Sequence, residues 1–310
     1  QLLPSMIEEK GKLFCNRCGS QIDLEHWKLQ IGSYYCRACI QLGRIRGDEP
    51  LYYFPQVAFP QEEVLNWQGT LTPFQSRVSE ALVQSLGQED PVMVHAVTGA
   101  GKTEMMYHVV AEVIRRGESV CIATPRIDVC IELYHRMTRD FTCPISLLHG
   151  DSEPYFRTPL VIATTHQLLK FYRAFNLLIV DEVDAFPFVD NAMLYQAVSN
   201  ALAKKGKLIY LTATSTKELD RKVKNKELKR VSLPRRFHGN PLVVPKKVWL
   251  QDIRRKIEKE QVPRKLLTLI KQQRKTHYPL ILFVSEIKLG EKMLRILRKL
   301  FPNEKLELVT

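Results

Sequence analysis

Long apolar runs are missing from this 310-residue sequence, and their absence argues against a helical membrane span. A span needs about 20 consecutive apolar residues, whereas runs such as residues 177–180 have only the length of a strand. Acidic residues are also scarce, because 33 aspartates and glutamates stand against 46 lysines and arginines. The resulting charge of +13 favours a polyanion, nucleic acid above all, as partner over a basic surface without a special task.

The cysteine count is seven, an odd number that comes without a secretory signature. This usage suggests a reducing compartment, so we expect a cytoplasmic protein. Cys121, Cys130 and Cys143 lie in apolar surroundings and are interpreted as buried small hydrophobic residues. The other four cysteines form two close pairs near the start of the chain.

These pairs are Cys15 with Cys18 and Cys36 with Cys39, separated by 17 residues. Two Cys-x-x-Cys knuckles at this spacing are typical of a structural site in which four thiolates hold tetrahedral Zn²⁺. Disulfides and an iron–sulfur cluster are the alternatives, and a reducing compartment disfavours disulfides. Basic and aromatic residues surround the knuckles. The module therefore either contacts DNA by phosphate binding and stacking, or serves as a scaffold for a partner.

From about residue 63, short apolar runs alternate with segments of helical periodicity. We expect strands at 92–97, 119–124, 160–163, 177–181 and 208–212, and helices at 102–116, 128–139 and 192–203. This alternation predicts an α/β domain whose parallel sheet is covered by helices on both faces.

The same pattern suggests four regions along the chain. They are a zinc-binding module at 1–50, a linker at 51–62, an ATP-binding domain at 63–245 and the incomplete beginning of a second α/β domain at 246–310. In the last region we expect helices at 265–275 and 289–300, and strands at 280–284 and near Leu306.

A glycine-rich loop, Ala-Val-Thr-Gly-Ala-Gly-Lys-Thr at 96–103, follows a predicted strand and opens a predicted helix. The loop glycines allow backbone N–H groups to point at phosphate, and the helix N-terminus adds partial positive charge. Lys102 is expected to reach the β- and γ-phosphates, and the Thr103 hydroxyl to hold Mg²⁺. The alternative is a glycine-rich turn without a ligand. The predicted phosphate-binding residues are Thr98, Gly99, Gly101, Lys102 and Thr103.

An acidic tetrad, Asp-Glu-Val-Asp at 181–184, directly follows the apolar strand predicted at 177–181. The end of such a strand lies at the carboxyl edge of the sheet, where parallel sheets bind ligands. Asp181 would hold Mg²⁺ through water, and Glu182 would orient and deprotonate the attacking water. An acidic surface turn is the alternative, but the tetrad lies about 80 residues after the phosphate loop, which favours the catalytic interpretation.

Together with Thr-Ala-Thr at 212–214, these two elements resemble motifs I, II and III of the superfamily 2 helicases. The resemblance implies a RecA-like fold, with ATP and Mg²⁺ as ligands. It also implies that Asp184, Thr212 and Thr214 couple the ATP site to nucleic acid. A simple preference of threonine for strand ends is the alternative for Thr212 and Thr214.

Weaker elements follow the same order of motifs. Residues 71–75 resemble the adenine-recognition element, with Gln75 as the base contact, and 281–284 resemble the start of motif IV in a second RecA-like domain. Residues 124–126 and 163–166 resemble motifs Ia and Ib, which implies backbone contacts to nucleic acid by Thr124, Pro125, Arg126 and Thr165. Alternatively, Gln75 is an ordinary surface residue, and the two threonines are helix caps. Because the motifs that supply an arginine finger would follow residue 310, we expect this segment to bind ATP but to hydrolyse it poorly alone.

A basic stretch at 217–236 contains nine positive residues against three acidic ones. It either lines a strand-binding surface or is a solvated face. The sequence pattern does not distinguish the two.

The leading four-cysteine module, Thr-Gly-Ala-Gly-Lys-Thr-Glu at 98–104 and Asp-Glu-Val-Asp-Ala-Phe-Pro-Phe at 181–188 are together similar to the ComFA competence proteins. This resemblance covers nearly the whole chain. It implies an ATPase that moves single-stranded DNA during natural transformation. Such a protein works at the inner face of the cell membrane, beside the DNA-uptake channel and other late competence proteins, and the resemblance leaves a homo-oligomer open.

Two other functions compete with this one. A replication-restart DNA helicase shares the Gly-Lys-Thr-Glu and Asp-Glu features, but that family places its zinc-binding cysteines late in the chain. A zinc adaptor with a nucleotide-switched, non-motor ATP site is the second alternative. It would depend on the cysteines alone, whereas a motor would also require Lys102 and Glu182.

Overall fold

The computed structural model describes residues 1–185, 188, 191–233 and 245–309, and the chain forms two compact units, Gln1–Leu242 and Val243–Thr310. Phe186 and Pro187 of the acidic motif, and Arg235 and Arg236 of the basic stretch, lie outside the described residues. None of the described helices combines the length and the apolar character needed to cross a membrane.

The first unit contains a seven-stranded sheet in which every pair of neighbouring strands is parallel. The strand order is β13 (Lys229–Leu233), β7 (Val92–Ala96), β12 (Leu202–Thr212), β11 (Phe175–Val180), β8 (Val120–Thr124), β10 (Leu160–Thr164) and β9 (Ile145–Leu148). The predicted parallel α/β sheet is therefore confirmed, with β9 and β13 as additional outer strands.

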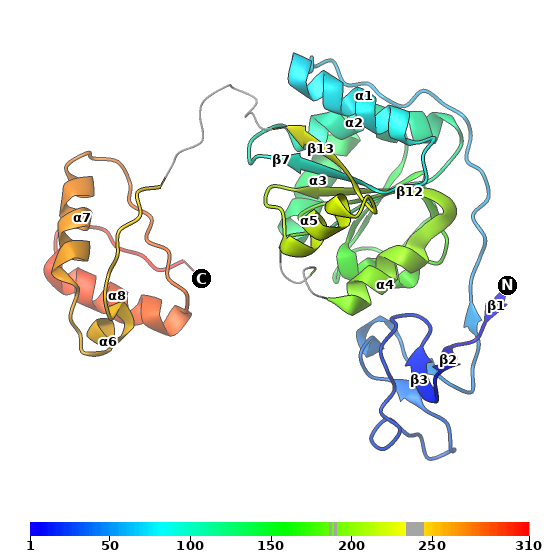
Figure 1. Cartoon of the computed structure of the whole chain (residues 1–310), viewed down its shortest axis with the longest axis horizontal. Coiled ribbons are helices and arrows are strands. Elements are labelled where there is room, and N and C mark those ends of the chain that lie inside the picture. Colours follow the sequence, from blue (N-terminus) through cyan, green and yellow to red (C-terminus); the bar gives the residue numbers. More distant parts are fainter. Residues whose placement is uncertain (186–187, 189–190, 234–244, 310) are drawn as a thin grey trace. The chain divides into compact units, whose positions relative to one another are not determined.

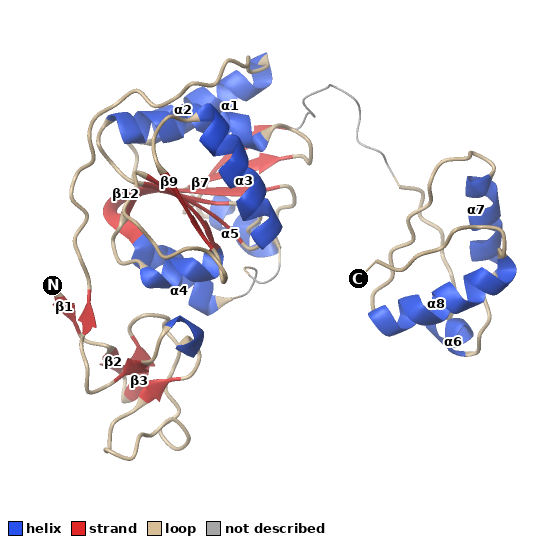
Figure 2. Cartoon of the chain, turned by 180° about the vertical axis from the view of Figure 1, so that it is seen from behind, coloured by secondary structure: helices blue, strands red, loops and turns tan. Residues whose placement is uncertain are grey.

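Helices cover both faces of this sheet (Figures 1 and 2). One face packs against α1 (Pro73–Ser85), α2 (Lys102–Arg115) and α3 (Ile127–Asp140), and the other against η2 (Thr165–Lys170), α4 (Ala192–Ala201) and α5 (Lys217–Lys224). Alternation along β8 shows the cause: Val120 and Ile122 belong to the first core, and Cys121 and Ala123 to the second. Because successive strand residues face opposite sides, an unbroken apolar run serves both cores.

A small cysteine module, residues 1–52, precedes the sheet. It consists of three antiparallel pairs and a short 3-10 helix: β1 (Leu2–Leu3) with β6 (Leu51–Tyr52), β2 (Met6–Glu9) with β3 (Lys12–Cys15), β4 (Tyr35–Cys36) with β5 (Ile45–Arg46), and η1 (Ile40–Leu42). The module is attached to α4, because Asn200 Nδ2 donates to the carbonyls of Asn16 at 3.1 Å and Arg17 at 3.2 Å.

An extended strap, residues 53–72, joins the cysteine module to α1 and follows the surface of the sheet domain. Backbone bonds hold it there: the N–H of Phe59 donates to the carbonyl of Gly117 at 2.8 Å, and that of Asn66 to the carbonyl of Asp140 at 2.8 Å. The strap therefore has a defined path although it contains no helix.

The second unit contains three helices in its described part: α6 (Ile253–Glu258), α7 (Arg264–Arg274) and α8 (Ile287–Leu300). Two of them confirm the helices expected at 265–275 and 289–300. The strands expected at 280–284 and near Leu306 were wrong, since no strand occurs among residues 245–309. The physical reason is that a strand needs hydrogen-bonded neighbours. Ile281 and Phe283 remain 74% and 89% exposed.

Candidate active site and metal centre

The phosphate loop is the tight turn between β7 and α2. Gly99 and Gly101 have φ values of +78° and +74°, in the left-handed region that favours glycine. A Cβ atom on Gly101 would also lie 2.4 Å from Gln75 Nε2, so a larger residue there would displace the Gln75 side chain. Lys102 and Thr103 form the first turn of α2, so the positive end of the helix dipole borders the cleft that the loop lines.

Gln75 connects α1 to this loop. Its side chain completes a capping box with Thr72, whose backbone N–H donates to Gln75 Oε1 at 2.9 Å, while Gln75 Nε2 donates to the Ala100 carbonyl at 2.9 Å. The residue is only 2% exposed. Its contact with the adenine base remains a prediction. To make that contact, the Gln75 amide would have to give up its bond with Thr72 or with Ala100.

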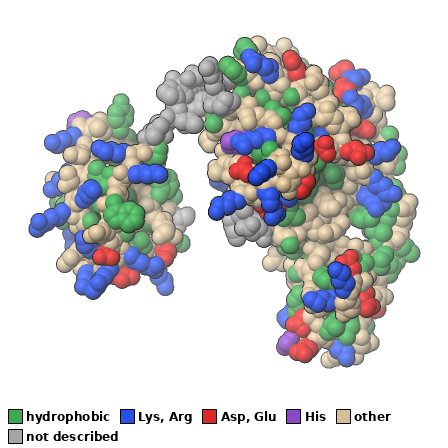
Figure 3. Space-filling view, in the orientation of Figure 1, with side chains coloured by type: hydrophobic (Ala, Val, Ile, Leu, Met, Phe, Trp, Pro, Cys, Tyr) green, Lys and Arg blue, Asp and Glu red, His purple; other side chains and the backbone are tan. Residues whose placement is uncertain are grey.

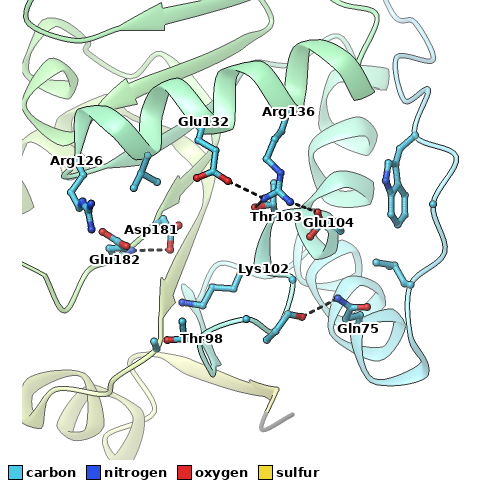
Figure 4. Close-up of a pocket in the computed structure, with 18 of the residues that line it drawn as sticks. Gln75, Thr98, Lys102, Thr103, Glu104, Arg126, Glu132, Arg136, Asp181 and Glu182 are labelled. Carbon is cyan, nitrogen blue, oxygen red and sulfur yellow. Dashed lines mark hydrogen bonds and ion pairs between the residues drawn. The ribbon is translucent and has the colours of Figure 1, made fainter. Parts of the chain in front are cut away.

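Figure 4 shows the cleft that these elements share, with a volume of about 980 Å³. Asp181, Glu182 and Asp184 enter it from the end of β11, opposite the phosphate loop. All of the predicted phosphate-binding and acidic residues therefore lie together at the carboxyl edge of the sheet, although their chemical roles remain predictions.

Asp181 is held rigidly within this cleft. Its backbone N–H donates to the Ala123 carbonyl at 2.8 Å, and its Oδ1 accepts from the Glu182 N–H at 2.8 Å. Burial raises the pKa of the Asp181 carboxyl, and the positive charge of Lys102 partly opposes this effect. A partly buried carboxylate in this position gains from a cation beside it, and a carboxylate with a threonine hydroxyl is an oxygen donor set that suits Mg²⁺.

Glu182 adopts a backbone conformation that is unusual for a residue with a side chain, with φ of +52°. Such a conformation costs of order 1 kcal/mol or more and persists only where the surroundings impose it. In this conformation the Glu182 N–H donates to Asp181 Oδ1, and the Glu182 carboxylate lies in the cleft beside Arg126 (Figure 4).

The acidic tetrad and the Thr-Ala-Thr segment are joined by a hydrogen-bonded link. The buried Thr212 Oγ1 lies 2.7 Å from Asp184 Oδ1 and 2.6 Å from the Thr214 carbonyl, and it accepts from the Thr214 N–H at 3.1 Å. The three residues predicted to couple the site to nucleic acid are thus in direct contact, while the coupling itself remains a prediction.

Arg136 on α3 was missed by the sequence analysis. Its Nη1 donates to Thr103 Oγ1 at 3.1 Å, and its Nη2 pairs with Glu104 at 2.8 Å (Figure 4). The guanidinium thus engages the hydroxyl that we expect to bind Mg²⁺. No local motif marks this arginine, because the contact depends on how α3 packs beside α2.

The four residues predicted to touch nucleic acid differ in accessibility. Thr124 and Thr165 are fully buried, and within the described part of the chain their hydroxyls have no hydrogen-bond partner. Arg126 is exposed, pairs with Asp128 at 3.1 Å and lines the cleft of Figure 4, whereas Pro125 is partly buried. In this structure only Arg126 and Pro125 are accessible to a nucleic-acid strand, and the role of all four residues remains a prediction.

The basic stretch forms α5 and the outer strand β13 in its described part. Lys222 pairs with Glu218 at 3.0 Å and Arg230 with Asp220 at 3.4 Å, so two of its cations are partly neutralised. These pairs neither require nor exclude a strand-binding surface.

The four paired cysteines form one buried cluster. Sγ–Sγ separations are 3.6 Å for Cys18–Cys36 and for Cys36–Cys39, and 3.9 Å for Cys15–Cys39, and all four atoms lie within 4.8 Å of one another. A tetrahedral zinc site with Zn–S bonds of about 2.3 Å has sulfur–sulfur edges of about 3.8 Å. The cysteines are free thiols. The donor set and its spacing therefore suit Zn²⁺.

Comparisons with known proteins agree with this arrangement. Residues 1–53 match the family model described as the competence protein ComFA N-terminal domain, and residues 72–221 match that of the DEAD/DEAH box helicases. Competence protein ComFA of Streptococcus pneumoniae is 62% identical over 308 residues, which cover 99% of this chain and 71% of that protein.

More distant relatives follow. Competence protein ComFA of Bacillus subtilis is 37% identical over 296 residues, covering 93% of this chain and 64% of that protein. Replication restart protein PriA of Rickettsia prowazekii is 27% identical over 164 residues, which are 47% of this chain and 25% of that protein. The chain thus spans about two thirds of the length of its ComFA relatives.

Proposed function

This chain belongs to the ComFA family of competence proteins, and on that premise we propose that it is an ATP-driven motor that moves single-stranded DNA during natural transformation. Its DEAD/DEAH helicase domain implies an enzyme that uses ATP and Mg²⁺ to act on nucleic acid. The finer assignment, translocation along a single strand, is our proposal. So are a location at the inner face of the membrane and partnership with the uptake channel and other late competence proteins.

One observation carries the proposal: the phosphate loop, the acidic tetrad and the Thr212–Asp184 link surround one cleft. In the proposed reaction, Glu182 takes a proton from water as the water oxygen bonds to the γ-phosphorus and the bond to the β–γ bridging oxygen breaks. Lys102 stabilises the charge that develops on the phosphate oxygens. Thr103 and, through water, Asp181 would hold Mg²⁺, which would supply further charge neutralisation.

Arg136 would have to release Thr103 Oγ1 for this hydroxyl to bind the cation. Its Nη2 pair with Glu104 can persist, because it uses a different nitrogen. Thr212, the last residue of β12, is bonded to Asp184. Movement of the Asp184 carboxylate would therefore be passed to the end of β12 and to the residues that follow it. Zn²⁺ on the four cysteines would fix the fold of the N-terminal module.

The decisive experiment is steady-state ATP hydrolysis by the full-length protein with no nucleic acid, single-stranded DNA, forked duplex DNA or RNA, and Lys102→Ala as the blank. Stimulation by single-stranded DNA alone supports the proposal. Stimulation chiefly by forked duplex would instead indicate a replication-restart activity. Hydrolysis no higher than that of the blank under all conditions would indicate an adaptor, and the motor proposal would be abandoned.

A further inference from the structure

A groove of about 890 Å³ lies between the cysteine module, the strap and the amino edge of the sheet. One wall comes from Tyr52, at the end of β6, and Phe54, at the start of the strap. The other comes from Tyr155, Phe171 and Tyr172, which precede β10 and β11. Since the ATP cleft lies at the carboxyl edge, this groove is a separate site at the opposite edge of the same sheet.

Aromatic rings both build and line this groove. Tyr53 packs edge-to-face on Tyr172 at a centroid distance of 5.0 Å, and Tyr155 packs on Phe171 at 5.2 Å, which fixes the two walls. By contrast, Tyr52 is 72% and Phe54 89% exposed. Two large exposed rings beside an ordered aromatic wall are informative, since single exposed apolar residues are common but such clusters are not.

The charge of the groove has one sign. Arg17, Arg157 and Lys170 line it, and its described lining contains no aspartate or glutamate. Arg157 lies over the Phe59 ring at 3.7 Å, and its Nε donates to Gln56 Oε1 at 3.3 Å, so the cation is held in place along the strap. Figure 3 shows hydrophobic and basic side chains side by side along this strap. Cations interleaved with exposed aromatic rings are the combination that binds single-stranded nucleic acid, by phosphate contact and base stacking.

The groove continues beneath the cysteine module. A second cavity of about 600 Å³ shares Leu42, Leu169 and Lys170 with it and extends along η2 to Thr164 and His166, in the segment that resembles motif Ib. Gln167 also lines this cavity. It is 5% exposed, and no described residue donates a hydrogen bond to its Oε1. A buried acceptor without a donor is costly, so a donor such as a bound water is expected beside it.

From these observations, the geometry points to a second single-strand-binding track. The strand passes from the motif Ib segment, between η2 and the cysteine module, into the groove. There its bases stack on Tyr52 and Phe54, and its phosphates meet Lys170 and Arg157. The inference deepens the proposed function and rests on it, because it names where the moving strand is held outside the ATP cleft.

The track also gives the cysteine module a task. Arg17, whose carbonyl is bonded by Asn200, donates from Nε to Cys39 Sγ at 3.3 Å and from Nη1 to the Leu42 carbonyl at 3.0 Å. One wall of the track is therefore built directly on the cysteine cluster. The module would act as a clamp on the strand, which is a more specific role than a general scaffold.

The test is binding of fluorescent oligo-dT to the full-length Lys102→Ala protein without ATP, measured by anisotropy. Tyr52→Ala combined with Phe54→Ala should weaken binding about tenfold or more, because each stacked base contributes strongly. Tyr278→Ala is the matched control, since Tyr278 is 74% exposed but lies in the second unit, outside the track. It should bind as the parent does. A Tyr52/Phe54 double variant with the affinity of the Tyr278→Ala control would overturn the inference.

Photocrosslinking with 5-iododeoxyuridine oligonucleotides supplies an independent measurement. Crosslinks that map to peptides containing residues 52–57 support the track, and crosslinks confined to other peptides overturn it. Measuring the same variants with Lys102 intact separates the two proposals. If they keep single-strand-stimulated ATP hydrolysis but bind as the control does, the motor stands and the track fails. If instead the Tyr52/Phe54 double variant loses binding, and the parent protein with Lys102 intact shows no hydrolysis stimulated by single-stranded DNA, the track stands and the motor proposal fails.

Discussion

The two edges of the central sheet carry different chemistry. The carboxyl edge has charges of both signs on a tight backbone, with Asp181 near Lys102 and Glu182 beside Arg126. Around the groove at the amino edge, cations and aromatic rings occur without a described acidic residue. A site with both acidic and basic side chains suits a phosphate group that is bound together with a metal cation and then cleaved. A site with basic side chains and aromatic rings suits a nucleic-acid strand that is bound but not cleaved. The difference shows how a single sheet can keep a site suited to phosphate cleavage apart from a site suited to strand binding.

The largest expected effect lies at the carboxyl edge. Glu182→Gln keeps the size of the side chain and removes the base, so ATP hydrolysis should fall by about 10²- to 10⁴-fold. ATP binding and single-strand affinity should stay within about twofold, because neither edge loses a binding group. Hydrolysis and fluorescent-nucleotide binding measured on the same preparation check this. A parallel loss of nucleotide affinity would mean that Glu182 is structural.

The second largest effect is expected from removing the cysteine cluster, which supports one wall of the groove at the amino edge. Cys36→Ser with Cys39→Ser should remove bound zinc, measured by metal analysis, and expose the module to proteolysis. Single-strand affinity should drop about tenfold because Arg17 loses its support, whereas ATP binding should be retained. Cys143→Ser, a partly buried cysteine outside the cluster, is the control. Unchanged strand affinity in the zinc-free protein would separate the module from DNA binding.

Thr212 tests the connection between nucleotide cleft and strand. Thr212→Val preserves shape but removes the hydroxyl beside Asp184, so that partly buried carboxylate loses this hydrogen bond. We expect stimulation of hydrolysis by single-stranded DNA to fall about tenfold, with basal hydrolysis nearly unchanged. Thr212→Ser retains the hydroxyl and should behave as the parent. Equal losses in basal and stimulated rates would show that the link supports catalysis itself and has no separate coupling role.

The smallest effect is a pH dependence confined to the carboxyl edge. Because burial raises the pKa of Asp181, protons occupy this carboxyl at a higher pH than usual and compete with Mg²⁺. The Mg²⁺ concentration for half-maximal ATP binding should therefore start to rise at a higher pH, as the medium is acidified, than an ordinary aspartate would cause. Asp181→Asn should flatten this dependence. Strand affinity over the same range should change little, and a change as large as that of Mg²⁺ binding would contradict the separation of the two edges.

Much of the fold followed from local patterns. Buried parallel strands are continuous apolar runs, so their places were predicted correctly. A glycine-rich loop with Gly-Lys-Thr between a strand and a helix has few structural interpretations other than a phosphate loop, so its place was also predicted correctly. The cysteine cluster also followed from spacing alone. The strand expected at 280–284 failed because an apolar run specifies a strand only where neighbouring strands can pair with it.

The contacts that the sequence did not reveal join distant segments. Arg136 on α3 donates a hydrogen bond to Thr103 on the neighbouring α2. The groove brings together Arg17, Tyr52, Arg157 and Lys170 from four separate stretches of the chain. Each of these residues is ordinary within its own stretch. Their association depends on the path of the strap and the attachment of the module to α4, and no short-range pattern encodes either.

The left-handed backbone at Glu182 has a consequence for laboratory evolution. Glycine or asparagine would adopt φ of +52° at lower cost, so the wild-type residue carries a local stability penalty. In a selection for thermal tolerance alone, Glu182→Gly and Glu182→Asn should therefore recur among the enriched variants, each more heat-resistant and each inactive. Their enrichment would vanish once the same library is also selected for transformation.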